Sequence, residues 1–167
     1  IDPTSKGEVI KGVFEDVADI TNHQFPDFSN YEDYQHIEKR RQEVPDKWLM
    51  GGMPGFTFNI ARKLFKLDKY LANLLLEKDL LHQLHDKIDI MLAEMIRNYA
   101  QAGVDCVMFP EDWGTQTQTL INPDLWWEEF FPRFQKLCSL AHDSGIKVFM
   151  HSCGAITEII QGLMEAG

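Results

Sequence analysis

The second half of the chain alternates long amphipathic segments with short apolar ones, and this order strongly restricts the folds open to it. Residues 78–102 carry apolar side chains at the spacing of a helix, and Gly103 follows as a stop signal. A short apolar segment at 104–109, a helical segment at 123–143 and a second apolar segment at 146–150 come next. Helices of this length connect neighbouring parallel strands, so we expect an α/β fold with a parallel sheet and outer helices.

Residues that typically start or break helices mark the ends of these elements. Asn122 followed by Pro123 is typical of a helix start, because the Asn side chain caps free N–H groups and proline needs no hydrogen bond there. Pro132 predicts a kink or break inside the helical segment, since it removes one hydrogen bond of the helix. A last helix is expected to begin at Ala155 or Ile156.

The first half of the chain gives weaker signals. Residues 47–52 are a candidate buried strand that ends in two glycines, and short amphipathic helices are expected at 58–65 and 70–76. Upstream, residues 34–43 predict a polar helix, and apolar side chains spaced along 9–20 predict another short helix.

The length of 167 residues suits one domain. We expect residues 1–46 to form an N-terminal helix and loop region of that domain, and residues 47–167 to form its main part. The first six residues are polar and do not resemble a signal peptide.

Composition excludes several kinds of partner. The chain has 16 Lys and Arg against 26 Asp and Glu, a net charge of −10, whereas nucleic acids and anionic membrane surfaces require a basic face. No apolar run approaches the ~20 residues of a membrane-spanning helix. The three cysteines do not form the pattern of a disulfide framework, which favours a reducing, cytoplasmic setting.

Two polar loops follow the expected strands at 104–109 and 146–150. In parallel α/β folds, ligands bind at the carboxyl ends of the strands, so we expect both loops to face one pocket. The side chains of interest in these loops are Glu111, Asp112, Trp113, Gln116, His151 and Cys153.

The first loop offers two adjacent acids and an indole. Glu111 and Asp112 are expected to serve as catalytic acid/base or polar contact groups, with Trp113 and Gln116 binding the substrate. The alternative is that the acids cap a helix in a solvated loop and that Trp113 packs in the core. The sequence leaves both interpretations open.

His151 and Cys153 are two residues apart, so their side chains point the same way in an extended segment. Imidazole and thiolate together are typical zinc ligands. The pair ends a strand and precedes Gly154, which strengthens the case for a metal site. The alternative is a buried cysteine beside a hydrogen-bonded histidine. A complete zinc site needs a further protein ligand, which is not evident, because Cys106 lies within a strand and Cys138 within a helix.

Several motifs occur in the order found in the uroporphyrinogen decarboxylase superfamily. They are Gly52-Met53-Pro54-Gly55-Phe56-Thr57, Ala102-Gly103-Val104-Asp105, Glu111-Asp112-Trp113-Gly114, Asn122-Pro123, Pro132 and His151-Ser152-Cys153-Gly154. The chain resembles this superfamily over roughly residues 45–167. The resemblance implies a (β/α)8 TIM barrel, which typically takes about 250 residues. We therefore expect the chain to form the middle of such a barrel, without its outer strands at either end.

The resemblance is closer to the corrinoid-linked methyltransferases than to the decarboxylases. The decarboxylases have an Arg-rich N-terminal motif and a Glu-Ser pair where this chain has Glu111-Asp112, and they lack the His-x-Cys motif. The methyltransferases hold zinc with His-x-Cys and a much later cysteine. His151 and Cys153 match the first two ligands, and the third would lie beyond Gly167.

The resemblance thus implies a zinc-dependent methyltransferase component. It would move a methyl group between a methylated small molecule or thiol and a corrinoid carried by a partner protein. The alternatives are a metal-free decarboxylase of a tetrapyrrole-like substrate and a non-catalytic fragment; the acidic loops count against a polyanionic substrate. An incomplete sheet would also have an unpaired edge, which favours a homo-oligomer.

Overall fold

A computed structural model describes residues 9–167, so the polar start of the chain that was compared with signal peptides lies outside the described residues. The strands β1 (Met50–Gly52), β2 (Cys106–Pro110) and β3 (Lys147–His151) form a sheet in that order. Both pairs are parallel, and the β2–β3 register runs from Cys106 opposite Lys147 to Pro110 opposite His151. The parallel α/β fold expected from the sequence is confirmed.

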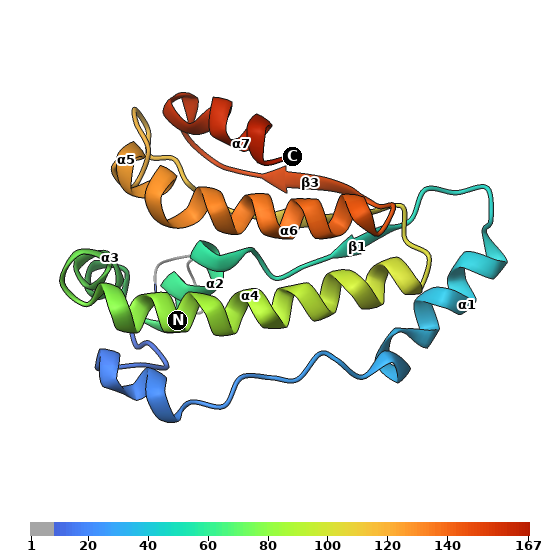
Figure 1. Ribbon diagram of the computed structural model, residues 1–167, viewed down its shortest axis with the longest axis horizontal. Helices are drawn as coiled ribbons and strands as arrows, with labels where there is room; N and C mark the ends of the chain where they lie inside the picture. The colour runs from blue at the N-terminus through green and yellow to red at the C-terminus, as the bar shows by residue number, and fades with distance from the viewer. Residues whose placement is uncertain (1–8) are drawn as a thin grey trace.

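Helices connect the strands, and α4 and α6 lie side by side in front of the sheet (Figure 1). Two 3-10 helices, Val17–Asn22 and Tyr31–Tyr34, come first. They are followed by α1 (Gln35–Glu43), α2 (Thr57–Leu64), α3 (Leu67–Leu76), α4 (Lys78–Gln101), α5 (Pro123–Leu125), a π-helical turn (Trp126–Phe130), α6 (Phe131–Asp143), a 3-10 turn (Thr157–Ile159) and α7 (Ile160–Ala166). The helices expected at 34–43, 58–65, 70–76 and 78–102 are therefore found close to their predicted bounds.

The irregularity expected near Pro132 takes the form of the π-helical turn. Pro132 is at the start of α6, where its missing N–H removes a hydrogen bond of the continuous helix. The turn just before it, Trp126–Phe130, widens to a π-helix. This places two acids, Glu128 and Glu129, on the side of the turn that faces α4.

The core lies between the sheet and the helices. Val107 and Phe109 of β2 are fully buried, and Phe109 stacks on Phe56 with ring centroids 3.5 Å apart. Phe134 of α6 packs edge-on against the same pair. Burying aromatic side chains of this size is a main source of stability, so the face of β2 that carries Val107 and Phe109 is fixed against the helices.

The other face of the sheet is open within the described residues. Met50 of β1 and Phe149 of β3 are 53% and 49% exposed. The expectation of a buried strand at 47–52 is therefore corrected: only Met50–Gly52 pair with β2, and Met50 and Gly52 are exposed. Alternation explains this result, because Met50 and Gly52 share the uncovered face while Gly51 faces the Tyr99 ring.

The helix expected at 9–20 is wrong. Residues 9–16 are not helical, and a 3-10 helix runs only from Val17 to Asn22. Gly12 packs against the end of α2, where an added Cβ would lie 2.6 Å from the Leu64 carbonyl oxygen, and Phe14 N–H donates to that oxygen at 2.8 Å. This tertiary contact replaces the helical hydrogen bonds, and the Asp16 cap starts the 3-10 helix afterwards.

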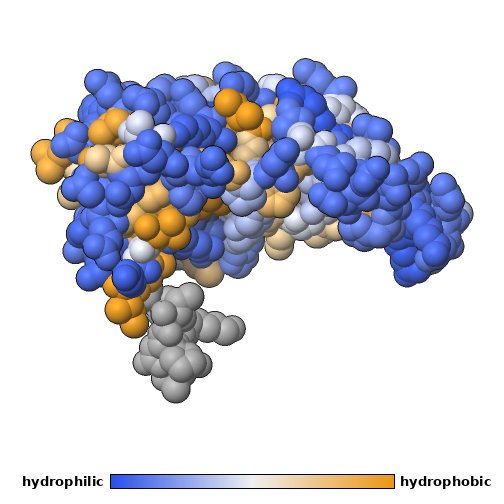
Figure 2. Space-filling view, turned by 90° about the horizontal axis from the view of Figure 1, so that it is seen from below, coloured by the Kyte–Doolittle hydropathy of each residue, from blue (hydrophilic) through white to orange (hydrophobic). Residues whose placement is uncertain are grey.

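The N-terminal segment then runs along α4 to α1 at the far end of the molecule (Figure 1). α1 has no buried residue, and that end of the surface is uniformly hydrophilic in Figure 2. Arg41 of α1 donates to the carbonyl oxygens of Gly103 at 2.7 Å and Lys47 at 2.8 Å and pairs with Asp105. These contacts attach α1 to the segments that lead into β1 and β2. No helix in residues 9–167 is long and apolar enough to cross a membrane.

Candidate metal centre

The loops after β2 and β3 cross in direct backbone contact. A Cβ atom added to Gly114 would lie 2.5 Å from the Ala155 nitrogen, and one added to Gly154 would lie 2.5 Å from the Gly114 carbonyl carbon. Gly154 has a φ of 78°, which glycine adopts without strain. The N–H of Gly114 donates to the Cys153 carbonyl at 3.2 Å, and that of Ala155 donates to the Thr115 carbonyl at 2.9 Å. The crossing fixes the two loops relative to each other.

Asp112, His151 and Cys153 meet at the carboxyl ends of β2 and β3. His151 Nε2 lies 3.3 Å from Cys153 Sγ and 3.8 Å from Asp112 Oδ1, and one ligand atom from each residue lies within 4.8 Å of the others. The Cys153 N–H also donates to Asp112 Oδ1 at 3.0 Å. The pairing of Pro110 with His151 brings these side chains together.

This donor set fits zinc. Tetrahedral zinc with one sulfur, one nitrogen and one oxygen ligand places neighbouring ligand atoms about 3.3–3.6 Å apart. The distances of His151 Nε2 from Cys153 Sγ and from Asp112 Oδ1, 3.3 Å and 3.8 Å, are close to this range. The Asp112 carboxylate raises the pKa of the Cys153 thiol, because two negative charges would otherwise lie side by side. A divalent cation between them would reverse this effect. Asp112, which the sequence suggested as a catalytic acid, thus stands where a third ligand belongs.

Glu111 and Asp112 are adjacent in sequence but have different surroundings. Glu111 is fully buried, and its carboxylate accepts the N–H groups of Phe56, Phe58 and Asn59 at the start of α2, at 3.0–3.2 Å. Burial raises the pKa of Glu111 to about 8, while these N–H groups act in the opposite direction. Of the two acids expected to be catalytic, only Asp112 faces the cluster; Glu111 caps α2 behind it.

The two expected substrate-binding residues lie outside the cluster. Trp113 is fully buried and stacks on Phe58 with ring centroids 4.1 Å apart, which is the core-packing role left open by the sequence. Its backbone N–H donates to Ser152 Oγ at 3.1 Å, which links the two loops again. Gln116 is exposed on the turn between Gly114 and Thr119. A role for Gln116 in binding substrate stays a prediction.

One cation beside the cluster could not be anticipated from the sequence. Arg62 of α2 has a side chain only 14% exposed, and its Nη2 lies 3.7 Å from Asp112 Oδ2. It sits in an ordinary amphipathic helix, so no local pattern distinguishes it from its neighbours. It reaches the site because α2 begins on the Glu111 carboxylate.

The other two cysteines are not part of the site. Cys106 is buried at the opposite end of β2, where its Sγ accepts the indole N–H of Trp48 at 3.1 Å. Cys138 is buried in α6, and burial raises its pKa to about 12. The sequence-based exclusion of both as ligands agrees with these positions.

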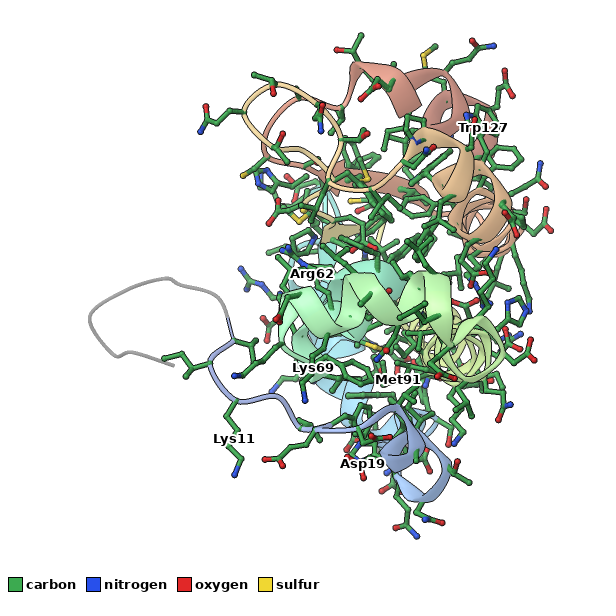
Figure 3. The ribbon with its side chains drawn as sticks, turned by 90° about the vertical axis from the view of Figure 1, so that its left-hand side faces the viewer. Lys11, Asp19, Arg62, Lys69, Met91 and Trp127 are labelled. Atoms are coloured by element: carbon green, nitrogen blue, oxygen red, sulfur yellow. The ribbon has the colours of Figure 1, made fainter. Side chains whose placement is uncertain are left out.

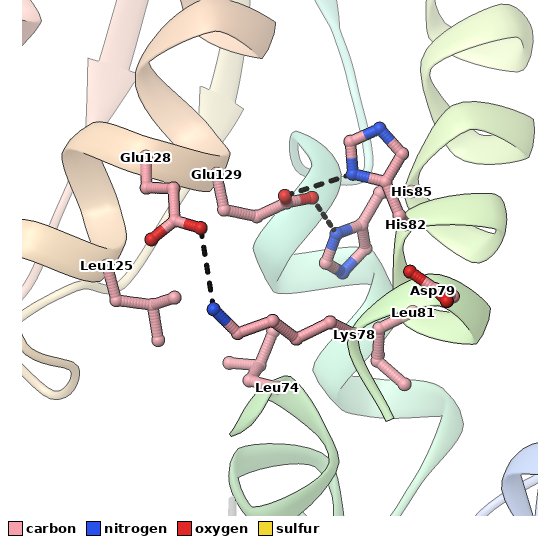
Figure 4. Close-up of a pocket in the computed structure, with 9 residues that line it drawn as sticks. All are labelled: Leu74, Lys78, Asp79, Leu81, His82, His85, Leu125, Glu128 and Glu129. Atoms are coloured by element: carbon pink, nitrogen blue, oxygen red, sulfur yellow. Dashed lines mark hydrogen bonds and ion pairs between the residues drawn. The ribbon is translucent and has the colours of Figure 1, made fainter. Parts of the chain in front are cut away.

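A second polar cluster lies between α4 and the π-helical turn, around a cavity of about 290 Å³ (Figure 4). Tyr70 Oη donates to His85 Nε2 at 2.9 Å, and His85 Nδ1 lies 2.7 Å from Glu129. Burial lowers the pKa of His85, so the neutral ring accepts from Tyr70 and donates to Glu129. Arg133 donates to the same carboxylate at 2.9 Å. These groups satisfy one another, which is typical of a structural network.

This network predicts a loss of stability in acid. Burial alone would raise the pKa of Glu129, but contacts with His85, Arg133 and His82 outweigh it and lower the pKa from 4.5 to about 2. A lowered pKa contributes stability that is present above pH 4.5 and is lost as the pH falls through about 2. We expect urea unfolding between pH 7 and pH 3 to show a steeper loss for the wild type than for Glu129→Gln. The exposed neighbour variant Glu128→Gln should follow the wild type, and equal slopes for all three would contradict the prediction.

Comparison with known proteins agrees with this architecture. The family model described as uroporphyrinogen decarboxylase (URO-D) matches residues 2–167. Among solved structures, a methyltransferase from Methanosarcina mazei aligns with a TM-score of 0.68 and 23% identity, over 80% of this chain and 38% of that one. A search of curated proteins gave no match. The chain thus spans well under half of its structural neighbour and has the fold of a partial (β/α)8 barrel. It belongs to the uroporphyrinogen decarboxylase family.

Proposed function

We propose that the protein is a methyltransferase component that uses zinc to move a methyl group between a small methylated compound or thiol and a corrinoid. The observation that carries this proposal is the convergence of Asp112, His151 and Cys153 at the carboxyl ends of β2 and β3. His151 and Cys153 are exposed, so a metal that they hold would be accessible to substrate from solvent. The likeness of the fold to a methyltransferase supports the same activity.

Each of these residues would have a separate role in binding the metal or in holding the site together. Cys153 and His151 supply the sulfur and nitrogen ligands, and Asp112 supplies an oxygen ligand from the other loop. Zinc held there would supply a Lewis acid that lowers the pKa of a substrate thiol or hydroxyl. The glycine crossing holds the two loops at the required separation, and Glu111 holds α2 behind them.

The remaining elements of the proposal rest on the family resemblance. They are a corrinoid bound to a partner protein, a further cysteine ligand beyond Gly167, a cytoplasmic location and association with other copies of the chain. The unpaired edges of β1 and β3 within the described residues are compatible with such association. Gln116 on the exposed turn is kept as a candidate contact for substrate.

A metal-free decarboxylation is the second candidate, because the matching family model bears that description. A polyanionic substrate would need several cations at the cluster, whereas the groups that meet there are a carboxylate, an imidazole and a thiol, with Arg62 beside them. The methyltransferase is therefore the better supported of the two.

Zinc content separates these candidates. We expect the purified full-length protein to bind close to one zinc per chain and Cys153→Ala to lose most of it, because the thiolate is the strongest of the three ligands described here. Cys106→Ala removes a thiol at the other end of β2 and should bind zinc like the wild type. Metal content by mass spectrometry and affinity by competition with a chromophoric chelator provide the measurement. A zinc-free wild type, or a Cys153→Ala variant with unchanged affinity, would remove the basis of the proposal.

A further inference from the structure

Arg62 is held in place from two sides. Its Nε donates to Asn59 Oδ1 at 3.0 Å, and the guanidinium carbon lies 5.7 Å from the centre of the Phe58 ring. Asn59 is itself fixed, because its Nδ2 donates to the Pro110 carbonyl at 3.0 Å at the end of β2. In Figure 3, Arg62 lies beneath the loop that follows β2. The guanidinium is thus attached to the strand that leads into the site.

The free end of this side chain faces Asp112. Arg62 Nη2 is 3.7 Å from Asp112 Oδ2, while the other carboxylate oxygen, Oδ1, faces His151 Nε2 at 3.8 Å and accepts the Cys153 N–H at 3.0 Å. One oxygen of Asp112 therefore faces the cluster, and the other faces Arg62. With side chains 14% and 34% exposed, this pair is less screened by solvent than a surface ion pair.

We propose that Arg62 is a positioning residue that keeps the Asp112 carboxylate turned toward the metal ligands His151 and Cys153. This inference rests on the proposed function and adds a residue that acts on the metal through Asp112. Carboxylate ligands of metals are commonly held by an outer partner, and loss of such a partner typically lowers metal affinity about 10–100-fold.

The charges of the site supply the physical reason. The Asp112 carboxylate lies against Cys153, whose N–H donates to Asp112 Oδ1 at 3.0 Å, so the carboxylate and a Cys153 thiolate would repel each other when no cation is near. Arg62 lies on the side of Asp112 away from Cys153 and offsets the carboxylate charge there. Without Arg62, the Asp112 carboxylate would have a lower free energy when turned out to solvent. The metal would then lose one preformed ligand.

Variants of two neighbouring cations test the proposal. Arg62→Met removes the guanidinium but keeps an unbranched apolar chain over Phe58. Arg62→Lys keeps the positive charge but lacks the planar guanidinium group. Lys63→Met removes the same charge from an exposed position on the same helix. We expect zinc affinity to fall about 10–100-fold in Arg62→Met, less in Arg62→Lys, and to stay within twofold in Lys63→Met.

A double-mutant cycle with Asp112→Asn separates positioning from general damage. If Arg62 acts through Asp112, Arg62→Met should have little further effect on zinc affinity once Asp112→Asn is present. An equal loss in both backgrounds, or an unchanged affinity in Arg62→Met, would overturn the proposal.

Metal-free protein gives an independent measurement. The Cys153 N–H donates to Asp112, so its amide resonance in a ¹⁵N–¹H spectrum reports where that carboxylate lies. The resonance should move in Arg62→Met and stay in place in Lys63→Met. If it does not move in Arg62→Met, Arg62 does not position Asp112. If it moves while the wild type binds no zinc, the positioning holds and the proposed metal function fails.

Discussion

Replacing Arg133 with methionine is expected to lower the free energy of unfolding by about 3–5 kcal/mol. Arg133 is 6% exposed and pairs with Asp89, which is 5% exposed, and with Glu129 and Asp86 at 2.9 Å and 2.8 Å. Methionine fills much of the same space but leaves the buried Asp89 carboxylate without a counter-charge. Urea unfolding at pH 7 would measure the loss.

Two further variants show whether the unpaired charge is the cause. Lys136→Met removes an exposed cation from the same helix and should change stability by less than about 0.5 kcal/mol. Adding Asp89→Asn to Arg133→Met should recover part of the lost stability, because the uncompensated carboxylate is then gone. A double variant as unstable as the sum of the two single variants would contradict this explanation.

Replacing Glu111 with alanine is expected to cost about 3 kcal/mol or more in unfolding free energy, because three buried N–H groups at the start of α2 lose their acceptor. Water does not readily replace a side chain that is fully buried. The same change should weaken zinc binding indirectly, since α2 carries Arg62 and borders the loop of Asp112. Thermal or urea unfolding, followed by zinc titration, gives both readouts.

Asp112→Asn is the matched control, one position further along the chain. Asp112 is partly exposed and caps no helix, so its loss should lower zinc affinity with only a small effect on stability. A Glu111→Ala protein as stable as the wild type would show that the α2 N–H groups find other partners. The capping role would then be wrong.

The sequence was informative where local signals and the fold agree. The spacing of apolar residues located α4, and Asn122-Pro123 located the start of α5, because capping depends on neighbours in the chain. The His-x-Cys pair and the loop of Asp112 were expected to meet because parallel strands end at the same edge, and Asp112, His151 and Cys153 do lie together.

Other features depend on contacts between distant segments and left no local trace. The different surroundings of Glu111 and Asp112 are set by where α2 begins, more than 50 residues earlier, as the Glu111–Phe56 contact spans 55 positions. Arg62 reaches the site for the same reason. The helix expected at 9–20 gave way to a contact with Leu64, which no periodicity within that segment could reveal.

The contact between Gly114 and Gly154 has an entropic consequence for whatever binds there. Ordering one backbone residue costs about 1–2 kcal/mol at 25 °C, and a ligand that had to order two loose loops would lose that much affinity for each residue it fixed. Here both loops are ordered by their own crossing when the chain folds. Asp112 comes from one loop and Cys153 from the other, so their donor atoms would form a preorganised chelate for a metal ion. Because the backbones touch, neither loop could move away from such an ion without moving the other.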